Sequence, residues 1–228
     1  MNRFGLNLLL ALLAVTLAAQ SPHAKETSAA AAASVTFDCD WPASTPQKFN
    51  IEVKSDGSAR YISSSPTRAS DQSNAGDEDY QLDFRVSDAT RGKIFKLAEQ
   101  AGYFQGDFDY RKHAIADTGK KTLTYADATR HFQTVFNYSE NQSIQELNHI
   151  FQGISTTLQH GRKLQFLRRF DRLGLEAELK GAEQNAESHN LAELQLIAPL
   201  LQSIANDPAI LNIARQRAKR LLAQSGAR

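Results

Sequence analysis

Apolar residues recur at every second position in the first half of the chain. Val35, Phe37 and Cys39, for example, alternate with polar neighbours. A period of two among β-branched and aromatic residues predicts half-buried strands. Asp56-Gly57, between two such segments, is a signal for a hairpin turn. The predicted strands cover residues 35–39, 49–53, 59–63, 80–86, 122–125 and 131–137.

One helix interrupts these strands. Ser87 suits its N-cap, because a serine oxygen accepts hydrogen bonds from free backbone N–H groups, and Gly102 supplies its stop. After Tyr138 the apolar period changes from two to about 3.6 and the chain reads as helical. Ser139 and Gln142 match a capping box at the start of this helical region.

The helical region is predicted to contain several helices. Gly161 predicts a break in the first of them. Asp207-Pro208 predicts the start of the last helix, with Asp as the N-cap and Pro as the first helical residue. Between these two points, apolar residues at helical spacing predict a short helix at 175–179 and another from 191 to 204.

Strands followed by helices indicate the α+β class: an antiparallel sheet of about six strands with one helix, followed by an all-helical C-terminal region. The helices either cover one face of the sheet or form a separate bundle, and both arrangements fit the pattern. We divide the chain into a signal peptide at 1–19, a flexible Ala/Ser-rich leader at 20–34, a sheet domain at 35–140 and the helical region at 141–228.

The N-terminus has the features of a secretory signal. Arg3 gives a positive start, residues 6–19 are mostly apolar, and Ala18 and Ala19 offer a cleavage site. The apolar stretch is shorter than the ~20 residues of a membrane-spanning helix. We therefore expect a secreted or periplasmic protein of a bacterial envelope with no transmembrane span after cleavage; a retained anchor is the alternative.

Composition narrows the possible functions. The chain has 228 residues, a formal net charge of +1 and 41% hydrophobic residues. These values exclude a disordered chain and argue against nucleic acid as a partner, because nucleic-acid binders are usually strongly basic. A single cysteine excludes an internal disulfide framework and multi-cysteine metal sites. No cofactor is expected, and no nucleophile-elbow, phosphate-loop or zinc-protease motif is present.

Cys39 lies between Asp38 and Asp40, which oppose formation of a reactive thiolate. It falls on the inward side of its strand, so we interpret it as a small buried residue, with an intermolecular disulfide as the alternative.

Asp107, Asp109 and His113 are the candidate metal ligands. Residues two apart in an extended segment project to one side, so the two carboxylates could share an ion. The alternative is a solvated loop whose aromatic residues pack on the core. His149 and His160 are eleven residues apart, or roughly 16 Å along a helix, which is too far to share a metal ion.

Basic residues cluster around two phenylalanines, Phe166 and Phe170. Such a combination can bind phosphates or lipid head groups, so membrane-surface contact is one hypothesis. The alternative is an ordinary solvated helix face. The basic residues are Arg162, Lys163, Arg168, Arg169 and Arg172.

The stretch from Tyr80 to Ile150 resembles domains of unknown function in secreted bacterial proteins. The resemblance is carried by a strand, a helix with Ile94-Phe95-Lys96-Leu97-Ala98 that ends at Gly102-Tyr103-Phe104, then Thr122-Leu123-Thr124, and a helix with Leu147-Asn148-His149-Ile150. It implies export and transfers no catalytic residue.

These observations favour a non-enzymatic envelope module that binds a partner protein or another envelope component. The alternative is a secreted hydrolase with an unrecognised site, using Asp107, Asp109 and His113 with a divalent ion. Whether the chain is an enzyme is left open, and the sequence leans against it because no catalytic motif is present.

Overall fold

A computed structural model describes residues 32–64 and 79–226. The predicted signal peptide and most of the predicted leader lie outside the described residues. The described chain forms six strands, five α-helices and two short 3-10 helices. The elements are β1 (Ser34–Asp40), β2 (Lys48–Lys54), β3 (Ser58–Ser64), β4 (Tyr80–Arg85), α1 (Asp88–Gln100), η1 (Gly102–Phe104), β5 (Lys120–Ala126), β6 (His131–Phe136), α2 (Gln142–Phe170), α3 (Leu175–Glu187), η2 (Leu194–Ile197), α4 (Ala198–Asn206) and α5 (Asn212–Gln224).

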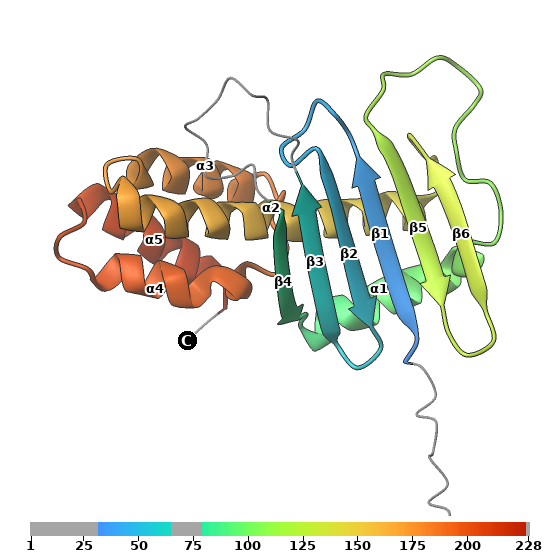
Figure 1. Cartoon of the computed structure of the whole chain (residues 1–228), viewed down its shortest axis with the longest axis horizontal. Helices are drawn as coiled ribbons and strands as arrows, with labels where there is room; N and C mark the ends of the chain where they lie inside the picture. The colour runs from blue at the N-terminus through green and yellow to red at the C-terminus, as the bar shows by residue number, and fades with distance from the viewer. Residues whose placement is uncertain (1–31, 65–78, 227–228) are drawn as a thin grey trace, which may run out of the picture.

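The strands form one antiparallel sheet in the order β4-β3-β2-β1-β5-β6 (Figure 1). All six predicted strands are confirmed. In the strand register, Phe37 of β1 lies opposite Ile51 of β2 on one side and opposite Leu123 of β5 on the other. The turn between β2 and β3 is the predicted one: Gly57 adopts a φ of 85°, and the carboxylate of Asp56 accepts a hydrogen bond from Ser58 N–H.

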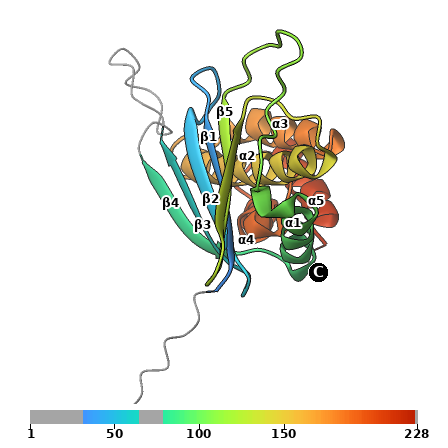
Figure 2. The same ribbon diagram turned by 90° about the vertical axis from the view of Figure 1, so that its right-hand side faces the viewer.

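The alternation of side chains gives the sheet a buried face and a polar face. Phe37, Ile51 and Tyr61 are fully buried on the inner face, which α1 and α2 cover. The outer face carries polar pairs such as Arg60 with Asp83. Figure 2 shows helices on only one side of the sheet, and no described element covers the other. The α+β class is thus confirmed.

Ser87 is the N-cap of α1 as predicted, and its hydroxyl accepts a hydrogen bond from Thr90 N–H. The helix ends at Gln100 with Ala101 as its C-cap, and Gly102 then begins η1 with a φ of 58°.

The start of α2 corrects the predicted capping box. Asn141, and not Ser139, is the N-cap, because the Asn141 side chain accepts hydrogen bonds from the N–H groups of Ser143 and Ile144. The Ser139 hydroxyl instead accepts a hydrogen bond from Asn141 N–H, before the helix begins. The helix therefore begins at Gln142.

The predicted break at Gly161 is wrong. α2 continues for 29 residues, from Gln142 to Phe170. Gly161 is required by packing: a Cβ atom there would lie 2.5 Å from Cγ2 of Ile197 in η2. The glycine allows η2 to approach α2, and the hydrogen bonds on both sides keep the helix continuous.

The start of the last helix is also corrected. α5 begins at Asn212, so Asp207 is not its N-cap. The Asp207 carboxylate accepts a hydrogen bond from Ala209 N–H in the turn between α4 and α5. The proline in the first turn of a helix is Pro199, in α4.

Two hydrophobic clusters fill the molecule, and α2 belongs to both. Ile144, Leu147 and Phe151 pack under the sheet in the first cluster. Leu164 and Leu167 pack against α3, η2, α4 and α5 in the second. Helices thus both cover the sheet and extend beyond its edge as a bundle (Figure 1).

Two polar clusters join the helices to each other and to the sheet. Glu183 of α3 is buried and pairs with Arg217 and Arg220 of α5. Glu193, with a φ of 58°, accepts hydrogen bonds from the backbone N–H and the hydroxyl of Ser87, each at 2.7 Å. This carboxylate links the helical part to the N-cap of α1.

Candidate functional site

The candidate site begins at the turn between β1 and β2. Trp41 N–H donates to the carbonyl of Gln47 at 2.8 Å, and the Ser44 hydroxyl contacts the carbonyls of Trp41 and Pro46. Gly119 lies directly against Trp41: a Cβ atom there would be 2.3 Å from Cβ of Trp41. Trp41 is therefore held in place at the end of the sheet, half-buried.

A row of polar side chains on α2 faces this turn. The row has spacings of three, four, seven and four residues, so its members lie on one side of the helix. Gln145, Asn148 and Gln152 line one pocket, of about 300 Å³. Gln152, Gln159 and Lys163 line a second, of about 650 Å³. We call the row the α2 amide row; its members are Gln145, Asn148, Gln152, Gln159 and Lys163.

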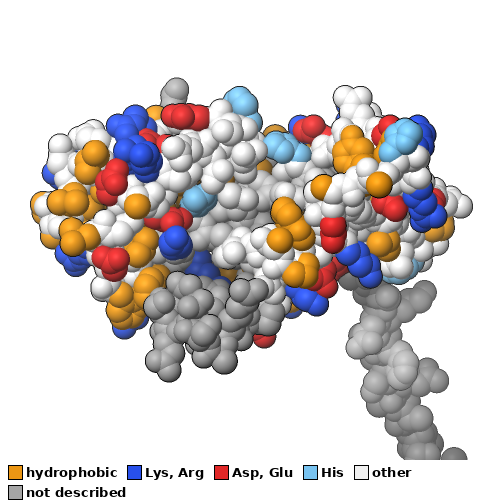
Figure 3. Space-filling model, turned by 90° about the horizontal axis from the view of Figure 1, so that it is seen from above, with side chains coloured by type: hydrophobic (Ala, Val, Ile, Leu, Met, Phe, Trp, Pro, Cys, Tyr) orange, Lys and Arg blue, Asp and Glu red, His pale blue; other side chains and the backbone are white. Residues whose placement is uncertain are grey.

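The two pockets adjoin each other. Trp41 and Gln152 line both of them. Both pockets lie between the end of the sheet and α2, and we call the pair the end groove. Figure 3 looks onto this end of the molecule, where the middle of the face is recessed and largely white, the colour of uncharged polar side chains and backbone.

The end groove has unused hydrogen-bonding capacity. Gln152 donates through Nε2 to Oδ1 of Asn148 at 2.9 Å. Among the described residues, no partner is found for Oε1 of Gln152, Nδ2 of Asn148 or the indole N–H of Trp41. An acceptor and two donors are thus available to a ligand.

A buried network fixes the floor of the larger pocket. The hydroxyl of Tyr61 lies 3.0 Å from that of Ser155 and accepts a hydrogen bond from Nε2 of Gln159 at 2.7 Å. Gln159 also donates to the hydroxyl of Ser63. Burial raises the pKa of Tyr61, so its hydroxyl stays neutral.

The far wall of the larger pocket is an ion-pair network between α2 and α3. Glu178 accepts from Nδ1 of His160 at 2.6 Å and from Nζ of Lys163 at 2.9 Å. Nε2 of His160 lies 2.9 Å from Nδ2 of Asn185. Burial alone would raise the pKa of Glu178, but the hydrogen bonds from His160 and Lys163 outweigh it and lower the pKa. Glu178 is therefore a carboxylate at neutral pH.

This arrangement occupies both ring nitrogens of His160. Nδ1 faces the Glu178 carboxylate, and Nε2 lies within hydrogen-bond distance of the Asn185 amide. No ring nitrogen is left to take a proton from a ligand in the pocket, which supports a positioning role for His160 over general-base catalysis.

The five basic residues of the predicted surface do not share one face of α2. Arg162 packs over the ring of Tyr80 at 4.9 Å, and Lys163 pairs with Glu178. Arg168 lies six residues after Arg162, which places it roughly 240° around the helix. Arg162 and Lys163 border the end groove, whereas Arg168 and Arg169 lie in the last turn of α2 and Arg172 follows it.

Two of the three predicted metal ligands lie close together, and the third does not join them. Asp107 and Asp109 both pair with Arg111, and Asp109 accepts a hydrogen bond from Asn137 N–H at 2.9 Å. His113 instead lies near the ring of Tyr110. Within residues 32–64 and 79–226, no three His, Cys, Asp or Glu side chains group closely enough to hold a metal ion.

Cys39 is buried, at 5% exposure, and faces the core as predicted. Burial raises the pKa of its thiol, which disfavours a reactive thiolate. Lys121 pairs with it across the strands, a neighbour that local sequence did not reveal. The Lys121 ammonium is itself occupied by the carbonyls of Thr118 and Asn137.

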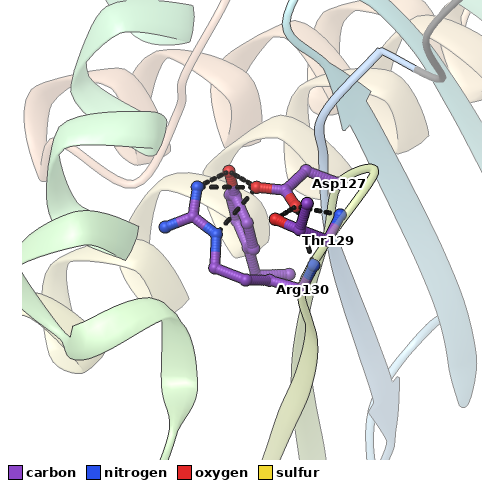
Figure 4. Close-up of polar contacts among 4 residues, drawn as sticks. Asp127, Thr129 and Arg130 are labelled. Atoms are coloured by element: carbon purple, nitrogen blue, oxygen red, sulfur yellow. Dashed lines mark hydrogen bonds and ion pairs between the residues drawn. The ribbon is translucent and has the colours of Figure 1, made fainter.

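The largest fall in a carboxyl pKa belongs to a turn at the opposite end of the sheet. Asp127 accepts hydrogen bonds from the backbone N–H groups of Thr129 and Arg130 and from the Arg130 guanidinium, which hold its pKa far below the usual value (Figure 4). Arg130 also packs over the ring of Tyr103 at 3.9 Å. Because these groups satisfy one another, the cluster locks the β5–β6 hairpin and is not a ligand site.

No family model matches the chain, and no similar sequence is found among curated proteins. In the described part of the chain, no helix combines the length and apolar character needed to cross a membrane. The likeness to exported domains of unknown function stays a prediction.

Proposed function

We propose that this protein is an exported, non-enzymatic binding module of a bacterial envelope, and that the end groove is its ligand site. The predicted signal peptide supports export. The observation that carries the proposal is the groove itself, in which Trp41 and α2 amides line two adjoining pockets, and Gln152 Oε1 and Asn148 Nδ2 keep hydrogen-bonding capacity for a ligand. Binding sites typically combine a concave shape with a few placed polar groups.

The chemistry of the end groove favours a chain rich in hydroxyl groups, such as an envelope glycan. A side-chain amide both donates and accepts, and so does a hydroxyl group. Trp41 adds a flat, amphipathic surface with one N–H donor. The row from Gln145 to Lys163 extends about 27 Å along α2, which suits an elongated ligand.

A peptide ligand fits the groove less well. Peptides are commonly bound by pairing with a free sheet edge or by filling apolar pockets. The floor of the end groove is the side of α2, whose backbone groups are used within the helix. Recognition here must come from side chains, as it does for a glycan.

Fluorescence titration tests the proposal directly. Trp41 is the single tryptophan of the chain, so its emission reports on the groove without a label. A chain starting at residue 20, which omits the predicted signal peptide, is titrated with N-acetylglucosamine oligosaccharides and with soluble glycan fragments of a bacterial cell wall. We expect a saturable change in emission.

Variants locate the binding site. Gln152→Ala together with Asn148→Ala removes the unpaired acceptor and donor and is expected to weaken binding about 10-fold or more. Gln81→Ala with Gln133→Ala removes two exposed amides from the outer face of the sheet and is the matched control. No binding by the wild-type chain, or equal losses in both double variants, would refute the proposed site.

The alternative, a metal-dependent hydrolase, is tested separately. Asp107 and Asp109 already pair with Arg111, so we expect Ca²⁺, Mg²⁺ or Zn²⁺ to leave the melting temperature unchanged. A rise in melting temperature that is lost in Asp109→Asn would favour the alternative.

A further inference from the structure

The helical part ends in an exposed apolar surface. Two turns lie at this end of the molecule, one between α2 and α3 and the other between α4 and α5 (Figure 1). Phe170 at the end of α2 and Leu173 in the first turn are 63% and 74% exposed, and Leu211 in the second turn and Ile213 at the start of α5 are 49% and 52% exposed. We call these four residues the apolar tip. Figure 3 shows hydrophobic side chains gathered at this left-hand end.

Three arginines lie close to the apolar tip in the sequence. Arg168, Arg169 and Arg172 lie within two residues of Phe170, and none of them forms an ion pair with an acidic side chain of the described chain. The Arg169 guanidinium lies 5.0 Å from the Phe170 ring centre. The nearest carboxylate in sequence, Asp171, accepts a hydrogen bond from Gly174 N–H and so caps the turn.

We propose that the apolar tip seats the protein on an anionic lipid surface. Exposed aromatic and aliphatic side chains bury in the boundary between head groups and acyl chains, and neighbouring arginines pair with lipid phosphates. A protein partner of ordinary composition would not require three arginines without acidic partners around an apolar centre. The charge pattern therefore favours lipid, and the predicted export would place the protein beside a membrane.

Vesicle sedimentation tests this surface without involving the end groove. The chain starting at residue 20 is mixed with vesicles of phosphatidylglycerol and phosphatidylcholine in equal parts, and with vesicles of phosphatidylcholine alone. We expect binding to the anionic vesicles only, and expect it to weaken as salt is added, because salt screens the attraction.

Matched variants separate a specific surface from general charge. Arg168→Gln, Arg169→Gln and Arg172→Gln combined should weaken binding on the order of 100-fold, since each basic residue near an anionic surface contributes about 1 kcal/mol, or about fivefold. Lys54→Gln, Lys96→Gln and Lys120→Gln remove the same charge from exposed sites elsewhere and should have a small effect.

The apolar contribution is tested with Phe170→Ser and Leu173→Ser, which should also release the protein from vesicles. Ile62→Ser, on the outer face of the sheet, is the control. The proposal is overturned if the wild-type chain does not bind anionic vesicles at low salt, or if the arginine and lysine variants lose binding equally. It is also overturned if these serine substitutions abolish self-association measured by sedimentation but leave vesicle binding intact, because the tip would then contact a second copy.

Discussion

At the scale of single residues, Glu183 shows how a buried charge is tolerated. Burial would raise the pKa of its carboxyl group, but hydrogen bonds from Arg220 and Arg217 outweigh that effect and lower it. The carboxylate thus connects α3 to α5. A buried pair of this kind is strongly destabilising to break, because one charge is then left without its partner.

A pH dependence of stability follows from that lowered pKa. The folded protein binds the proton less tightly than the unfolded chain, whose reference pKa is 4.5. Glu183 therefore contributes stability at pH values above 4.5, and the contribution is lost as the pH falls through the folded pKa. Urea midpoints measured from neutral to acid pH should fall across this range.

Glu183→Gln provides the comparison for this pH dependence. We expect it to lower the free energy of unfolding at neutral pH by about 1–3 kcal/mol. We also expect stability to fall less steeply as the pH is lowered from neutral to acid. An unchanged slope would mean that another carboxyl group, such as Glu178, dominates. Glu187→Gln, at an exposed site of the same helix, should change neither quantity.

At the scale of elements, sequence pattern predicted the strands and α1 well and the starts of α2 and α5 poorly. Alternation is repeated along a whole strand, so one ambiguous residue does not hide it. A helix start depends on which of several neighbouring polar residues caps it, and Ser139 and Asn141 are both good caps. The role of Gly161 depends on Ile197, a distant residue that local pattern does not reveal.

The end groove could be predicted only in part. The amide row has helical spacing and is visible in the sequence once α2 is known to be continuous. Its partner Trp41 is more than one hundred residues away, and only the packing of the helix across the sheet brings the two together. Arg111, two residues from Asp109, pairs with the carboxylates of both Asp107 and Asp109, and the sequence pattern did not reveal this pairing.

The close approach of α2 and η2 gives a prediction at this scale. Gly161→Ala places a Cβ atom 2.5 Å from Cγ2 of Ile197, so we expect a loss of about 1–3 kcal/mol in the free energy of unfolding despite the better helix propensity of alanine. Gly181→Ala in α3 meets only His160 at 3.9 Å and should gain about 0.5–1 kcal/mol.

Combining the two substitutions at the contact checks the mechanism. Adding Ile197→Ala to Gly161→Ala should cost less than the sum of the single changes, because the small side chain removes the clash. If the losses of stability measured by urea denaturation add strictly, the contact between residues 161 and 197 is not the cause of the loss in Gly161→Ala.

At the scale of the whole molecule, two cores share one helix. α2 contributes to the cluster under the sheet and to the cluster among the later helices. Glu193 adds a second connection through Ser87. We therefore expect the sheet part and the helical part to unfold together.

Two probes test that expectation. Trp41 fluorescence reports on the end of the sheet, and far-ultraviolet circular dichroism reports mainly on the helices. Their urea midpoints should coincide in the wild-type chain and shift together in Leu167→Ala, a substitution that acts in the second core. Midpoints that separate would show two independently folding units and contradict the expectation.

The unbroken course of α2 has a further consequence. Gln152 in the end groove and Phe170 at the apolar tip are eighteen residues apart on the same helix, which is roughly 27 Å along its axis. Five full turns separate them, so both point to the same side of the rod. If the apolar tip rests on a bilayer, α2 acts as a spacer of fixed length. It sets the distance of the end groove from the membrane surface and the direction in which a bound ligand faces.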